Sequence, residues 1–136
     1  LSAGVGWVMS VSEELESLRS ELPGCSLVAF TDLSSKLVLS SSAAVRPAQE
    51  ELDELSEAAH LALQGPVAEG AAPVWEDGIG QGAGMAMLLT ATEARVVVRQ
   101  PGENSEALVC VCSPGADLAK AADRGRATLE RILAET

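Results

Sequence analysis

Between residues 85 and 113 the sequence alternates apolar side chains with small or polar ones in three short runs. The runs cover residues 85–90, 95–99 and 107–112, and two polar turns at 91–94 and 101–105 separate them. A period of two, β-branched residues and turns rich in Pro, Gly and Asn are typical of an antiparallel meander. This stretch therefore predicts three consecutive strands, and nothing in it has the pattern of an active site.

The residues before position 43 predict a helix followed by a hairpin. A capping-box pattern, Ser10 with Glu13, precedes an apolar stripe over residues 11–22, and Pro23-Gly24 ends that helix. Two strands follow at residues 25–31 and 36–42. The first is apolar almost throughout, so we expect it inside the sheet with both faces covered, whereas the second ends in serines and is expected at an edge.

A second helix is predicted between Pro47 and Gly65, because apolar residues recur there at steps of three and four. A third helix is predicted after the meander, with Ser113 as its N-cap and Pro114 at its first position. Gly125 lies on the apolar stripe of this third helix. Since glycine lowers helix propensity, its position there indicates a close approach to the sheet or to another helix.

The long connection between residues 66 and 84 is rich in Gly, Ala and Pro, and it contains the run Gly-Ile-Gly-Gln-Gly-Ala at 78–83. That run resembles a dinucleotide-binding fingerprint, which must follow a buried strand and open a helix. Here acidic Glu76-Asp77 precede it and a predicted strand follows. We therefore interpret the segment as a loop and expect no cofactor.

Composition narrows the functional classes. The chain has 136 residues, enough for one domain, and a net charge of −11, which disfavours nucleic acid as a partner because phosphates would be repelled. No apolar run is long enough to insert into a membrane. His60 is the single histidine and lies in a predicted helix, so neither a catalytic triad nor a metal cluster is expected. The three cysteines are expected to be reduced, mostly buried and free, in a cytoplasmic protein.

The predicted order α-β-β-α-β-β-β-α describes a single α+β domain, a five-stranded antiparallel sheet flanked by three helices with a profilin-like layout. We assign this domain to residues 10–136. Residues 1–9 lack the basic start of a signal peptide and are expected to be an N-terminal extension, disordered or derived from upstream sequence, with Met9 as an alternative start.

This order and several segments resemble the roadblock family of dynein light chains and its bacterial relatives, the regulators of Ras-like gliding-motility GTPases. The similar segments are residues 15–32, the hairpin after them, the helix at 51–63 and the stretch 108–132. The resemblance implies a homodimer that binds a partner and catalyses no reaction. It also implies that the first meander strand pairs with its own copy while the second helices pack nearby. The residues expected at that dimer interface are Met85, Met87, Leu88, Leu89, Leu52, Leu55 and Ala59.

An apolar edge strand without proline or inward charge promotes aggregation. We therefore expect the first meander strand, residues 85–89, to be covered, and pairing with its own copy across a two-fold axis is one way to do so. The glycine-rich connection is the alternative cover within one chain. Acidic residues on the second helix could steer a basic partner such as a small GTPase, although a solvated face and a favourable helix dipole explain them too. These expected partner-binding residues are Glu50, Glu51, Asp53, Glu54 and Glu57. The alternative function is a small-molecule sensor with an apolar pocket between sheet and helix.

Overall fold

The computed structural model describes residues 10–64, 84–100 and 105–134. The expectations for residues 1–9, for the connection at 65–83 and for the turn at 101–104 lie outside these ranges. The order of elements is the predicted one, α-β-β-α-β-β-β-α. Its elements are α2 (Val11–Glu21), β1 (Cys25–Asp32), β2 (Leu37–Ala43), α3 (Gln49–Gln64), β3 (Met85–Leu89), β4 (Ala94–Arg99), β5 (Glu106–Cys112) and α5 (Leu118–Ala134).

The five strands form one antiparallel sheet in the order β2-β1-β5-β4-β3. The apolar strand β1 lies between β2 and β5, and the serine-rich β2 lies at an edge, as predicted. The strand β3 forms the opposite edge. The register between β1 and β2 shifts at Phe30/Thr31, which inserts an irregularity into the first hairpin.

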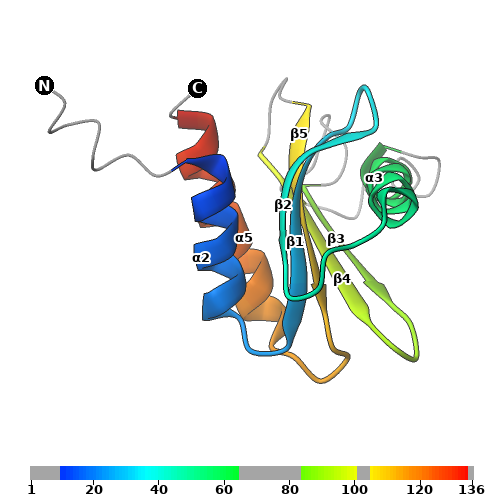
Figure 1. Cartoon of the computed structure of the whole chain (residues 1–136), viewed down its shortest axis with the longest axis vertical. Coiled ribbons are helices and arrows are strands. Elements are labelled where there is room, and N and C mark those ends of the chain that lie inside the picture. The colour runs from blue at the N-terminus through cyan, green and yellow to red at the C-terminus, as the bar shows by residue number, and fades with distance from the viewer. Residues whose placement is uncertain (1–9, 65–83, 101–104, 135–136) are drawn as a thin grey trace, which may run out of the picture.

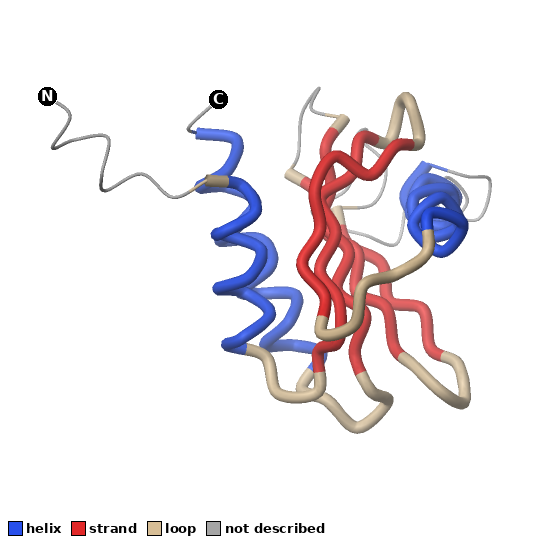
Figure 2. Tube along the Cα trace, in the orientation of Figure 1, coloured by secondary structure: helices blue, strands red, loops and turns tan. Residues whose placement is uncertain are grey.

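The sheet separates its helices into two layers (Figures 1 and 2). Helices α2 and α5 lie side by side on one face, and α3 lies on the other. The first helix begins as predicted, because Ser10 Oγ accepts a hydrogen bond from the Glu13 backbone N–H while the Glu13 carboxylate accepts one from the Ser10 backbone N–H.

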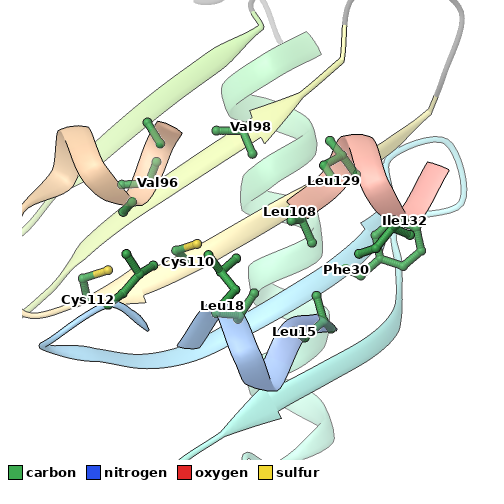
Figure 3. Packing of buried hydrophobic residues seen from close by; sticks show 14 residues of the cluster. Leu15, Leu18, Phe30, Val96, Val98, Leu108, Cys110, Cys112, Leu129 and Ile132 are labelled. Atoms are coloured by element: carbon green, nitrogen blue, oxygen red, sulfur yellow. The ribbon is translucent and has the colours of Figure 1, made fainter. Parts of the chain in front are cut away.

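The larger core cluster fills the space between the sheet and the paired helices (Figure 3). Leu15 and Leu18 of α2 and Leu129 and Ile132 of α5 are almost fully buried there. Burial of one such side chain contributes about 1.5–3 kcal/mol. The members are Leu15, Leu18, Leu22, Val28, Phe30, Val96, Val98, Leu108, Cys110, Cys112, Ala121, Ala122, Leu129 and Ile132.

A smaller cluster lies under α3 on the opposite face of the sheet. Leu55, Ala59 and Leu63 of the helix pack against strand residues that alternate with those of the larger cluster. Both faces of β1 are therefore covered, and this explains why its sequence is a nearly continuous apolar run. The strand and turn members of this cluster are Leu27, Ala29, Leu33, Val97, Ala107 and Val109.

The third helix begins later than predicted, at Leu118. The Asp117 side chain accepts a hydrogen bond from the Lys120 backbone N–H at 3.0 Å, and the Asp117 carbonyl accepts one from Ala121 at 3.1 Å. Asp117 is therefore the N-cap, and the assignment of Ser113 and Pro114 was wrong. The Ser113 carbonyl instead accepts a hydrogen bond from Ala116 in a turn.

The interpretation of Gly125 is confirmed. A Cβ atom at this position would lie 3.3 Å from Val98 Cγ2 and 3.9 Å from Cys110 Sγ. The missing side chain lets α5 approach strands β4 and β5 closely.

Candidate interaction surface

The strand β3 exposes apolar side chains along an edge of the sheet. It hydrogen-bonds to β4 on one side and ends the strand order on the other. Met87, Leu88 and Leu89 are 40%, 36% and 66% exposed. Met85 and Ala86 are partly buried, because Met85 packs against the larger core cluster and Ala86 against the smaller one. The exposed apolar surface is therefore concentrated at the end of β3 that leads to Thr90.

The residues of α3 that the sequence predicts at a dimer interface pack against the sheet of the same chain. Leu55 and Ala59 are buried against the chain's own sheet, and Leu52 is partly buried beside them. Leu61, which sequence reasoning did not single out, is 54% exposed. Its signal was weak, because one leucine off the apolar stripe of a helix is common on protein surfaces. Among the described side chains of β3 and α3, the exposed large apolar ones are thus Met87, Leu88, Leu89 and Leu61.

The five expected partner-binding acids are all exposed on α3. They are not equivalent, however. Glu54 forms a bidentate ion pair with Arg95 of β4, with Arg95 Nη1 and Nη2 each 2.8 Å from one carboxylate oxygen. Asp53 accepts a hydrogen bond from Gln49 Nε2 at 3.0 Å. The sequence could place the acids on one helix, but not the arginine that faces one of them.

Arg95 is held by two carboxylates, since its Nε also lies 2.6 Å from Glu93 Oε2. Hydrogen bonding to Arg95 lowers the pKa of Glu54 below its ordinary value, despite the opposing effect of burial. The same bonds raise the pKa of the Arg95 guanidinium further above its ordinary value. The group therefore stays charged over the whole neutral range. An arginine next to Val96, Val97 and Val98 was a sequence signal that this side chain needs a partner, but it did not indicate which one.

His60, the single histidine of the sequence, has a structural contact. His60 Nδ1 lies 3.0 Å from the Leu33 carbonyl oxygen, which ties α3 to the β1–β2 turn. Residues 10–64, 84–100 and 105–134 contain no group of three or more His, Cys, Asp or Glu able to hold a metal ion. Within the same ranges no helix has the length and apolar character to cross a bilayer.

The three cysteines are free thiols. Cys110 and Cys112 are buried, and Cys25 is half-buried opposite Cys112 in the pairing of β1 with β5. Hydrogen bonding with the Cys110 thiol, together with burial, raises the pKa of Cys25 to about 12. Hydrogen bonding with Cys25 and burial also raise the pKa of Cys112. Protonated thiols are poor nucleophiles, so this cluster lacks the properties of a reactive site.

Comparison with known proteins identifies the fold. No family model matches the chain, and no curated protein sequence matches it. The structure is similar to the Roadblock/LC7 domain from Streptomyces avermitilis, with a TM-score of 0.73 and 12% identity, covering 93% of this chain and 98% of that one. It is also similar to the gliding protein MglB from Thermus thermophilus, with a TM-score of 0.65 and 21% identity, covering 90% of this chain and 84% of that one.

A third similar structure is MglC from Myxococcus xanthus, with a TM-score of 0.62 and 15% identity, covering 94% of this chain and 100% of that one. Each comparison covers at least 84% of both chains, so the shared fold extends over the whole domain. The chain therefore has the roadblock-type fold, as the sequence resemblance implied.

Proposed function

We propose that this roadblock-type domain is a homodimeric, non-catalytic regulator or scaffold that binds a small Ras-like GTPase or a related signalling partner. The observation that carries the proposal is the exposed apolar edge of β3. Among the described residues no strand pairs with the outer side of β3, which carries the exposed Met87, Leu88 and Leu89. Such an edge invites pairing with another strand. A two-fold axis beside β3 would satisfy its backbone groups with a second copy of the same strand.

The side chains around this edge favour a homotypic contact. Leu61 of α3 is exposed as well, and Ala86 and Leu88 lie on the face of the sheet that carries α3. A partner strand would therefore bring its own α3 toward the first one. A stable interface of standard size buries about 800 Å² from each copy, so the proposed contact includes α3 as well as the short strand β3.

The GTPase part of the proposal rests on the fold and on surface charge. The similar structures include MglB, described as a gliding protein. The chain carries a charge of −11, and Glu50, Asp53 and Glu57 are exposed on α3. Such a surface attracts a basic region on a partner and accelerates its association.

The dimer is tested by sedimentation velocity of the purified chain and of Met87→Glu. We expect the parent to sediment as a dimer at about 20 μM, because a second copy would cover the exposed apolar side chains of β3. Met87→Glu is expected to sediment as a monomer, because two carboxylates would face each other across the axis. Leu39→Glu is the matched control, because Leu39 is 53% exposed on the opposite edge strand. A folded monomeric parent would refute the dimer.

The partner is tested by binding of the dimer to purified Ras-like GTPases from the same cell, loaded with GDP or with a non-hydrolysable GTP analogue. A regulator is expected to distinguish the two nucleotide states, because their switch regions differ. Equal, weak binding in both states would contradict this function. The alternative, a small-molecule sensor with an apolar pocket, has less support, since Ala59 and Leu63 pack the C-terminal half of α3 onto the sheet, while the opening beside its N-terminal half is lined by Glu51, Glu54 and Glu93.

A further inference from the structure

A groove of about 400 Å³ lies beside the N-terminal part of α3, between this helix and residues of strands β1, β4 and β5. Leu27 of β1, Val111 of β5 and Leu55 of α3 line it with apolar surface. Val45, in the connection between β2 and α3, also lines the groove and is 82% exposed. An exposed valine beside buried leucines gives the groove an apolar wall that water contacts.

The charged residues of the groove are unbalanced. Glu51, Glu54 and Glu93 line it, and Arg95 is the single basic residue among the described residues of its lining. Arg46 follows Val45 in the sequence but does not line the groove. The guanidinium of Arg95 is already occupied by Glu54 and Glu93. The groove therefore retains a net negative charge next to an apolar wall.

Carboxylates next to an apolar wall limit the kinds of group that can bind in the groove. An anion would be repelled by the carboxylates, and a purely apolar group would remove water from them without replacing its hydrogen bonds. A long basic side chain satisfies both parts, because its methylene stem covers apolar surface while its charged head remains among acids and water.

We propose that the groove receives a lysine or arginine side chain of the partner protein. Its stem would lie against Leu27, Leu55 and Val111, and its cation would be bound by Glu51 with help from Glu93. This inference rests on the proposed function, since it locates one contact of the partner on a dimer surface. It assigns Glu51 a role different from that of Glu50, Asp53 and Glu57, the exposed acids of α3 that do not line the groove.

The groove is tested with n-butylguanidinium as the probe and n-butylurea as its neutral counterpart, by following backbone amide shifts of the ¹⁵N-labelled full chain. We expect saturable shifts at Ser26, Val45 and Val111 with the cation. The urea is expected to bind about tenfold more weakly, because it lacks the charge-assisted hydrogen bond. Equal binding of the two probes, or shifts confined to other regions, would overturn the proposal.

Two variants complete the test. Glu51→Gln keeps the size of the side chain and removes its charge, and we expect it to weaken n-butylguanidinium binding about fivefold. Glu16→Gln removes an exposed charge from α2, on the opposite side of the sheet, and is expected to leave binding unchanged. An unaffected Glu51→Gln would remove Glu51 from the site and with it the inference.

The same samples are examined by sedimentation, so that the two proposals fail separately. A dimer that does not bind n-butylguanidinium would contradict the proposal for the groove and would still support the proposed dimer. A monomer that binds n-butylguanidinium at Val45 and Val111 would support the groove and count against the dimeric function.

Discussion

Arg95 on β4 and Glu54 on α3 form a bidentate ion pair that spans from the sheet to the helix, with both N–O distances 2.8 Å. The pair joins residues from opposite sides of the connection between α3 and β3. The Glu54 side chain is 58% exposed, so water and salt screen the attraction. Its energetic contribution is therefore that of a surface pair, about 0.5 kcal/mol.

A double-mutant cycle of Glu54→Gln and Arg95→Gln is expected to give this coupling of about 0.5 kcal/mol near pH 7. Arg95 lowers the folded-state pKa of Glu54 below the ordinary 4.5, so the stabilisation is present above that value and is lost as the pH falls through the lowered pKa. Urea denaturation at about pH 7 and at about pH 3 measures both couplings. A coupling that persists undiminished in acid would contradict the ionic interpretation.

The start of α5 gives a second prediction. Asp117→Ala is expected to lower the free energy of unfolding by about 1 kcal/mol, because the Lys120 backbone N–H loses its acceptor. Ser113→Ala is the control and is expected to cost much less, since Ser113 lies in the turn before the helix. Thermal or urea denaturation compares the two variants. If the serine variant proved the more damaging, the N-cap would be at Ser113 after all.

The cysteines give a third prediction. With Cys110 and Cys112 buried and the pKa of Cys25 raised to about 12, native protein is expected to react with iodoacetamide at pH 8 at least about a hundredfold more slowly than urea-unfolded protein. Mass spectrometry counts the labelled thiols over time. Because the folded pKa is raised, the associated stability is intact below the ordinary 9.0 and is lost as the pH rises toward 12. Rapid native labelling of two thiols would contradict this prediction.

The exposed acids of α3 give a fourth prediction. Replacing Glu50, Asp53 and Glu57 together by lysine is expected to change stability by less than about 0.5 kcal/mol per site, because exposed charges contribute little. It is expected to weaken binding of the GTPase partner at least about tenfold at low salt, with the difference shrinking as salt increases. Glu54 is left in place because it is paired with Arg95.

Isothermal titration of the reversed variant at two salt concentrations makes the measurement. The matched control reverses Glu16, Glu21 and Glu130, which are exposed on α2 and α5. Binding equal to that of the parent at both salt concentrations would reduce the acidic face of α3 to an aid to solubility.

Local sequence signals predicted most of the architecture. The alternation in residues 85–113, the stops at Pro23-Gly24 and the continuous apolar run of β1 each act within a few neighbouring residues, and each was confirmed. The start of α5 was missed because Ser113-Pro114 and Asp117 are both good caps. The choice depends on whether Ser113 is engaged elsewhere, and its backbone N–H donates to the Gly24 carbonyl.

The interaction surface could be predicted only in part, because contacts between a helix and a strand depend on how the two elements pack in the folded chain. The spacing of residues on α3 shows which acids are exposed, but the position of Arg95 beside Glu54 depends on how helix and strand are set against each other. The groove beside Val45 also depends on tertiary packing. Its walls come from several separate elements and from the connection before α3, and no local pattern brings these together.

The pairing of α2 with α5 has a consequence for how the protein is made. Leu15 and Leu18 are synthesised before Leu129 and Ile132, which form part of their buried surroundings, and Arg131 Nε lies 3.3 Å from the buried Glu14 carboxylate. Strand β1 likewise waits for β5. The apolar faces of α2 and β1 therefore remain exposed on the nascent chain until β5 and α5 have been made, a demand on chaperones that a domain built from sequential neighbours would not make.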